Sequence, residues 1–244
     1  MNNIKLFSED IKKSFILHIP HSSVNIPSLK GYVDLQLLFN EIVLVTDFNT
    51  DEIFNVPKIK KVKCNFNRLF CDVERMNDDK ELLYSVGRGF FYTKTDDGKI
   101  LRNENSKKNI YKNFYLKHHA KFEKKIDKIL EDSGVVYILD CHSFNDIPLK
   151  TDLNKTPDRA DICLGIDNFH TPPFLVNYIK NIFEKHNLSV NINIPYSGTI
   201  VPNKYYMKDK RINSIMIEVN KKIYLNSNEK IKELNSIIKE IFKF

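Results

Sequence analysis

The sequence has few cysteines, and their spacing matches neither a zinc knuckle nor a disulfide framework. Four occur in 244 residues, each in or beside an apolar run: Cys64, Cys71, Cys141 and Cys163. We therefore expect reduced thiols in the core. A catalytic thiol at Cys141 beside His142 is an alternative, but neighbouring side chains in a strand point to opposite faces, which opposes such a pair.

Long apolar runs and linker segments are also missing. No run is long enough to cross a membrane, and residues 1–10 lack the apolar core of a signal peptide, so we expect a cytoplasmic protein without membrane contact. No stretch rich in proline, glycine and serine divides the chain. Because 42% of the residues are hydrophobic, the chain can bury one sizeable core, and we expect residues 1–244 to form a single domain.

The basic residues are not gathered in one patch, although the net charge is +7. Lysines are spread over residues 58–63, 107–128 and 221–239, where they alternate with acidic residues as on a solvated helix surface. Nucleic-acid binding needs clustered Lys and Arg, so we expect no nucleic-acid partner. A basic field can still attract a small anionic substrate.

Two apolar runs each end near a histidine. Residues 15–19 precede Pro20 and His21, and residues 135–139 lead to His142. Such short runs are typical of buried parallel strands, whose carboxyl ends line the ligand crevice of an open α/β sheet. We therefore expect both histidines to face one crevice. Imidazole is a common zinc ligand, and a catalytic zinc usually has three N/O protein ligands, so a carboxylate is needed.

We interpret the apolar run 43–45 as the end of a third strand, and the acidic residues that follow it supply this carboxylate. Asp47 stands where the run stops, and Asp51 lies in the first turn of a short helix that Asn49 or Thr50 can cap. The helix dipole already explains Asp51, so we rank Asp47 slightly higher and leave both open. Either choice gives Zn²⁺ two histidines and one carboxylate.

Glu218 lies in the middle of the strand-like apolar run 214–219. Glutamate is seldom buried without a partner, and burial raises the pKa of a carboxyl group while a nearby metal lowers it. Such a group can take a proton from zinc-activated water and pass it to a leaving amine. The alternative is an edge strand from which Glu218 points to solvent.

Two arginines seven positions apart, Arg68 and Arg75, follow the strand-like run 59–63. Guanidinium binds carboxylates through paired hydrogen bonds, so an arginine near a metal hydrolase site predicts an anionic substrate. Arg68 is the first candidate, whereas Arg75 either binds substrate or pairs with Asp72 or Glu74.

Two turns add further candidates. Arg88 lies in a glycine-flanked turn that is either a lid or an ordinary hairpin, and it is a third cation, after Arg68 and Arg75, that can stabilise an oxyanion. The loop 195–199 follows an alternating apolar run, and its Tyr196 either donates to substrate or packs as a capping aromatic. Expected helices at 106–132, 172–186 and 226–244 alternate with the strand-like runs, which favours an α/β fold with a mixed, mainly parallel sheet.

Taken together, the motifs resemble the N-formylglutamate amidohydrolase family. Seven motifs occur in the family order along almost the whole chain: Pro20-His21-Ser22-Ser23, Thr46-Asp47-Phe48, Asn67-Arg68 with Asp72 and Arg75, Asp140-Cys141-His142-Ser143, Asp161 with Gly165, Asn193 to Gly198, and Ile217-Glu218-Val219-Asn220 with Tyr224. The resemblance implies a three-layer α/β/α fold related to zinc carboxypeptidases, and hydrolysis of an amide bond in an N-acyl amino acid.

The resemblance also implies roles for single residues. The metal ligands would be His21, His142 and an acid from residues 47–51. The other implied positions are an acid/base group, a carboxylate-binding arginine and two residues beside the substrate: Glu218, Arg68, Tyr196 and Gly198.

Two positions depart from the family pattern. Ser23 stands where glycine is more usual, and Glu74-Arg75 stands where Asn-Arg is typical. We expect N-formylglutamate or a related N-acyl amino acid as the substrate. The alternatives are another zinc amidase or carboxypeptidase-like enzyme, for example one acting on peptidoglycan, and a non-catalytic binding protein with the same fold.

Overall fold

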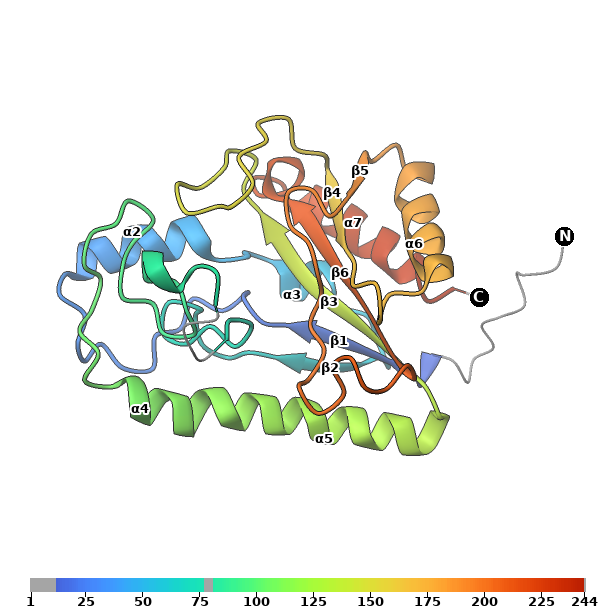
Figure 1. Cartoon of the computed structure of the whole chain (residues 1–244). Coiled ribbons are helices and arrows are strands. Elements are labelled where there is room, and N and C mark those ends of the chain that lie inside the picture. The colour runs from blue at the N-terminus through green and yellow to red at the C-terminus, as the bar shows by residue number, and fades with distance from the viewer. Residues whose placement is uncertain (1–11, 77–80, 244) are drawn as a thin grey trace, which may run out of the picture.

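A six-stranded mixed sheet runs through the molecule (Figure 1). The computed structural model describes residues 12–76 and 81–243, so the expectation for residues 1–10 lies outside it. The strand order is β2-β1-β3-β6-β4-β5, in which β2, β1, β3 and β6 are parallel and β4 is antiparallel to β6. The predicted mixed, mainly parallel sheet is thus confirmed. The strands are β1 (Phe15–Ile19), β2 (Lys60–Lys63), β3 (Val136–Phe144), β4 (Ile162–Gly165), β5 (Val190–Ile192) and β6 (Ile212–Asn220).

Helices cover both faces of this sheet. In Figure 1, α5 lies below the strands, and α6 and α7 lie above them. The helices are α2 (Leu35–Val45), α3 (Thr50–Ile53), α4 (Lys107–Ile110), α5 (Leu116–Ser133), α6 (Pro173–Lys185) and α7 (Asn228–Glu240). A π-helical turn, Tyr111–Tyr115, joins α4 to α5, and short 3₁₀ turns occupy Tyr84–Val86 and Lys221–Ile223. The α/β class expected from the alternation of elements is therefore confirmed.

Alternation along β3 separates two apolar cores. Ile138 faces α5, where Phe122, Ile126 and Ile129 form one fully buried stripe at helical spacing. Leu139 points to the opposite face, toward the helices above. Burying one such side chain stabilises the fold by roughly 1.5–3 kcal/mol, so these two cores hold the strands of the sheet in place.

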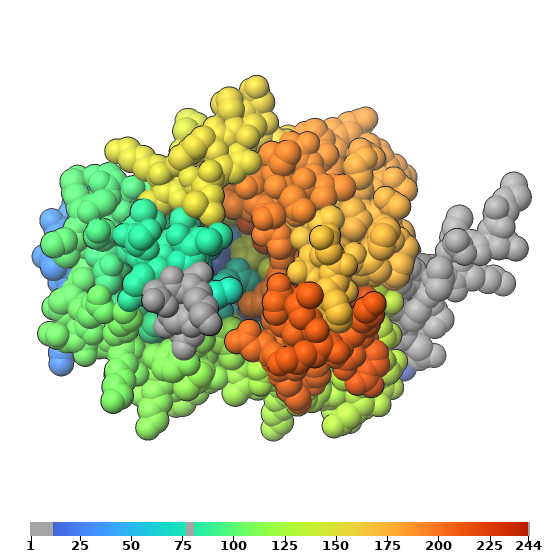
Figure 2. All heavy atoms as spheres, in the orientation of Figure 1, coloured from blue at the N-terminus to red at the C-terminus, as the bar shows by residue number. Residues whose placement is uncertain are grey.

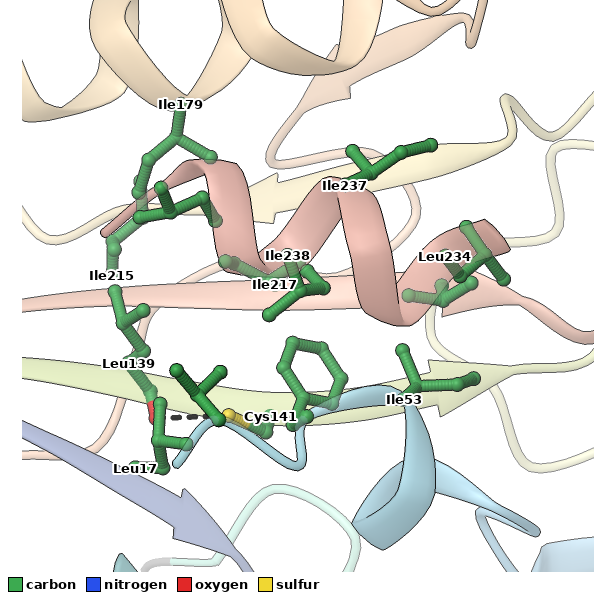
Figure 3. Close-up of a cluster of buried hydrophobic side chains, with 14 of the residues drawn as sticks. Leu17, Ile53, Leu139, Cys141, Ile179, Ile215, Ile217, Leu234, Ile237 and Ile238 are labelled. Carbon is green, nitrogen blue, oxygen red and sulfur yellow. Dashed lines mark hydrogen bonds between the residues drawn. The ribbon is translucent and has the colours of Figure 1, made fainter. Parts of the chain in front are cut away.

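Figure 3 shows the larger core, between the sheet and helices α3, α6 and α7. Cys141 lies in it and donates its Sγ–H to the carbonyl oxygen of Leu139 at 3.1 Å. All four cysteines are buried and free, as the sequence predicts. His142 lines the cavity described below, so the predicted absence of a Cys141–His142 pair is also confirmed.

The apolar run 43–45 is the last turn of α2, so our interpretation of Asp47 as a residue at a strand end is wrong. Asp34 begins this helix by accepting hydrogen bonds from two backbone N–H groups. Leu35, Phe39 and Val43 are more than half exposed, so α2 has apolar residues on its outer face as well and shows little amphipathic period.

No described helix is long and apolar enough to span a membrane.

Candidate active site

A cavity of about 370 Å³ lies at the carboxyl ends of β1, β3 and β6. In Figure 2 a hollow is visible where the teal, yellow and orange parts of the surface meet. The charged and imidazole side chains of its lining come from β3 and β6 and from the segments that follow β1, β2, β3 and β6: His21, Asp47, Arg68, Glu74, Arg75, Arg88, Asp140, His142, Asp152, Glu218 and Lys221. The volume suits a small molecule.

Strand register brings the central residues together. Asp140 and His142 are two positions apart in β3 and so share one face of the sheet. His142 pairs in register with Glu218 of β6, and Asp140 pairs with His18 of β1. His21 follows β1 by two residues, and its carbonyl oxygen accepts a hydrogen bond from the N–H of Asp47 at 3.1 Å. The ring centroids of His21 and His142 are 5.0 Å apart.

Each of these two imidazoles is oriented by carboxylates. His21 Nε2 lies 2.9 Å from Asp72 Oδ1, which leaves its buried Nδ1 without a hydrogen-bond partner. His142 Nε2 lies 3.1 Å from Asp140 Oδ1, and its Nδ1 lies 3.2 Å from Asp47 Oδ2. Asp47 Oδ2 is also 3.7 Å from His21 Nδ1, so Asp47 lies beside the Nδ1 atoms of both histidines.

Glu74 is a second carboxylate beside the histidines. Its Oε2 is 3.0 Å from His142 Nε2 and 3.9 Å from His21 Nδ1. Ligand atoms of His21, Glu74 and His142 lie within 4.8 Å of one another, and the same holds for His18, Glu74 and Asp140. The sequence did not lead us to predict Glu74 as a ligand. Its position two residues from Asp72 is the signal that could have revealed it.

Asp51 does not join this group. It pairs with Lys63, its side chain is 32% exposed, and it is absent from the cavity lining. Asp51 instead lies in the first turn of α3, where the helix dipole favours an acid. Of the two acids proposed from the sequence, only Asp47 is near the histidines.

The charges of the buried group depend on one another. Burial alone would raise the pKa of Asp47, but His142 and His21 hold that pKa well below its usual value. Burial alone would lower the pKa of His142, but Glu74 and Asp140 raise it well above the ordinary value. The positive charge of the protonated imidazoles thus balances the negative charge of the carboxylates. A divalent cation can take the place of these protons, so the residues present fit a metal.

Glu218 is 7% exposed, and its Oε2 has no hydrogen-bond partner. Burial raises the pKa of Glu218 to about 8. The positive charge of His142 opposes this rise, and the negative charge of Asp47 adds to it. Because β6 lies between β3 and β4, the edge-strand alternative is wrong. A carboxyl group with this environment can exchange a proton near neutral pH.

Three arginines line the same cavity, and each has a carboxylate partner. Arg68 donates from Nε and Nη2 to Asp72 Oδ2 at 3.1 and 2.9 Å. Arg75 Nη1 lies 3.4 Å from a Glu81 oxygen, and its buried Nε lies 3.9 Å from Asp72 Oδ2 without a hydrogen-bond partner. Arg88 Nη2 lies 3.2 Å from a Glu41 oxygen and is thereby fixed in the wall. Arg68 therefore orients Asp72, while Arg75 Nε keeps a donor that makes no hydrogen bond.

The opposite wall contains the two predicted loop residues. Tyr196 donates its hydroxyl hydrogen to Asp152 Oδ2 at 3.1 Å, so its ring and hydroxyl are fixed at the cavity rim. Gly198 also lines the cavity and has a φ of 84°, which favours glycine. Both residues lie where they can contact a bound substrate.

Two histidines outside the cavity lining, His118 and His170, are also buried. His118 Nε2 lies 3.0 Å from His18 Nε2, and His170 Nδ1 donates to the carbonyl oxygen of Ile212 at 2.7 Å. His118 stands four residues before Phe122 and so begins the apolar stripe of α5, a signal that could have revealed its burial.

Comparison with known proteins agrees with the family resemblance of the sequence. A family model described as N-formylglutamate amidohydrolase matches residues 13–225. No protein of curated function matches the chain. A crystal structure of N-formylglutamate amidohydrolase from Ralstonia eutropha JMP134 is 19% identical, with a TM-score of 0.79 over 94% of this chain and 91% of that one. A gene product of Agrobacterium tumefaciens is 18% identical, with a TM-score of 0.63 over 94% and 89%.

These structural likenesses show the shared fold, and the relation to zinc carboxypeptidases stays a prediction. The family match covers most of the chain, including the segments that carry both cavity histidines and Glu218. The chain therefore belongs to the N-formylglutamate amidohydrolase family.

Proposed function

We propose that this protein is a zinc-dependent amidohydrolase that cleaves the amide bond of a small anionic N-acyl amino acid, with N-formylglutamate as the first candidate. The main support is the position of Glu218, a buried carboxyl group in register with His142 and beside a group of imidazoles and carboxylates. Family membership agrees with this reaction class.

The proposed ligands are His21 Nδ1, His142 Nδ1 and Asp47 Oδ2. This choice leaves each Nε2 to its own carboxylate partner, Asp72 or Asp140, which is the usual arrangement around metal-bound histidines. Glu74 lies on the Nε2 side of His142 and is the alternative acid. Two imidazoles and a carboxylate are a ligand set that zinc accepts. When bound, zinc would polarise the scissile carbonyl and lower the pKa of a water molecule.

In this proposal Glu218 accepts the proton of the attacking water and then transfers it to the leaving amine. Its raised pKa places proton exchange near neutral pH, where general acid–base catalysis is most effective. Arg68 and Arg75 provide positive charge for the substrate carboxylate and the developing oxyanion.

Metal content and formate release from N-formylglutamate test the proposal together. We expect near-stoichiometric zinc in the purified protein and its loss in His142→Ala. The matched control is His186→Ala, because His186 pairs with Glu240 outside the cavity lining. Glu218→Gln should keep the metal and lose roughly 10²- to 10⁴-fold in rate. A wild-type protein that stays metal-free after zinc reconstitution would contradict the mechanism.

Two alternatives predict other outcomes. Another amidase would bind zinc but prefer a different acyl amino acid or peptidoglycan fragment in a substrate panel. The hypothesis of a non-catalytic binding protein would be supported if Glu218 faced solvent or if His21 and His142 lay far apart. Glu218 is instead buried, and the rings of His21 and His142 are 5.0 Å apart, so the enzyme is favoured.

A further inference from the structure

Lys221 is a buried cation in the cavity wall. It begins the 3₁₀ turn after β6, three residues beyond Glu218, and is only 6% exposed. Asn220 fixes this turn because its side chain accepts a hydrogen bond from the N–H of Lys222. Lys221 Nζ donates to Asn145 Oδ1 at 3.0 Å. The ammonium group is therefore held in place at the cavity.

Among the described residues, Lys221 differs from the arginines of the cavity in having no carboxylate within ion-pair distance. Arg68, Arg75 and Arg88 each pair with a carboxylate, whereas no carboxylate in the described part of the chain pairs with Lys221. An ammonium group has three donors, and a buried charge without a partner is costly. Burial lowers the pKa of Lys221, although the charges of Asp47, Glu218 and Asp152 raise it. The donors of Lys221 Nζ that have no hydrogen-bond partner among the described residues indicate that this position favours an anionic ligand.

The two sets of cations are carried by segments that follow strands on opposite sides of β1 and β3. Arg68 and Arg75 follow β2, whereas Lys221 follows β6, and β1 and β3 lie between these strands. Those two middle strands supply His21 and His142. A substrate whose amide reaches the histidines can therefore direct one carboxylate toward the arginines and a second toward Lys221.

We propose that Lys221 binds the side-chain carboxylate of a dicarboxylic N-acyl amino acid and so determines specificity for an acidic side chain. The inference rests on the proposed function and adds the residue that recognises the side-chain carboxylate. A desolvated, charge-assisted hydrogen bond distinguishes a carboxylate from an amide of the same shape, so glutamate should be preferred over glutamine.

Paired substrates test this role. Lys221→Met should lower kcat/KM for N-formylglutamate by about 10- to 100-fold while changing it little for N-formylglutamine. Lys221→Arg, which keeps the charge, should retain most of the preference for glutamate. The matched control is Lys222→Met, because Lys222 lies next in the chain but pairs with Asp146 and is not part of the cavity lining. Equal losses on both substrates in Lys221→Met would overturn the inference.

Binding of simple carboxylic acids separates this inference from the proposed function. By calorimetry, the wild type and Lys222→Met should bind glutarate more tightly than butyrate, and Lys221→Met should lose that difference. If the wild type hydrolyses neither formyl compound but shows this pattern, the proposed reaction fails and the anion site stands. If N-formylglutamate is hydrolysed and Lys221→Met still prefers glutarate, the role of Lys221 is wrong and the reaction stands.

Discussion

Glu218 shows how a single buried charge links the stability of this protein to its chemistry. Its pKa rises from 4.5 to about 8 because burial disfavours the ionised form. Below about pH 4.5 Glu218 is protonated in both the folded and the unfolded chain, and it does not destabilise the fold. As the pH rises from about 4.5 to about 8, the unfolded chain releases this proton more readily, so the free energy of unfolding falls.

We predict that the metal-free wild type loses thermal stability relative to Glu218→Gln over this pH range. Glutamine imitates the protonated carboxyl group and cannot ionise, so the difference in Tm between the two proteins isolates the contribution of Glu218. The measurement is thermal denaturation in a chelator at several pH values. With zinc bound the difference should shrink, because a nearby cation lowers the pKa of a carboxyl group. A Tm difference that does not change with pH would show that Glu218 is not buried as described.

Residue types predicted part of the site because some positions carry their own signal. Glu218 interrupts an apolar strand, and His142 ends an apolar run, so both were recognisable in the sequence. Glu74 and Lys221 were not, because their positions depend on how the segments after β2 and β6 fold over the sheet. Asp51 shows the converse error, since a helix N-terminus and a metal site attract the same residue type.

At the level of secondary-structure elements, the end of β4 positions one wall of the cavity. Gly165 is the last residue of β4, and a Cβ atom there would lie 2.3 Å from the carbonyl oxygen of Gly198 and 2.4 Å from Met216 Cε. Gly198 and Met216 both line the cavity. The close approach of β4 to this wall therefore requires glycine.

We predict that Gly165→Ala lowers the free energy of unfolding by about 1–3 kcal/mol, because the added methyl group overpacks a filled site. It should also raise KM, since the Gly198 loop must move. The control is Gly134→Ala, which strains the positive φ at the end of α5 but contacts no cavity residue. That variant should lose stability and keep KM. Denaturant titration and steady-state kinetics check both, and an unchanged KM in Gly165→Ala would refute the coupling.

Elements with one polar face were predictable, and those without one were not. The helix expected at 172–186 corresponds to α6, whose buried residues repeat at helical spacing. The outer side of α2 is also apolar, so its last turn was misread as a strand end. Strand order could not be predicted either, because it depends on pairings between residues far apart in the chain, such as His142 with Glu218.

At the scale of the whole molecule, the two main cores share the central strands. β1, β3 and β6 contribute side chains to both cores. One core lies between the sheet and α5, and the other lies between the sheet and helices α6 and α7. The cavity lies where these three strands end, so the geometry of its lining depends on both cores. Neither core can be lost without disturbing the strands that hold the other.

We predict that residues 1–244 therefore unfold as one cooperative unit. The chain has 11 tyrosines and no tryptophan, so tyrosine fluorescence can report tertiary packing while far-ultraviolet circular dichroism reports secondary structure. Both probes should give the same Tm. Zinc should raise that Tm in the wild type and not in His142→Ala, because a ligand that binds only the native state stabilises it. Two separated transitions, or a proteolytic fragment that refolds alone, would instead indicate two units and contradict the single domain.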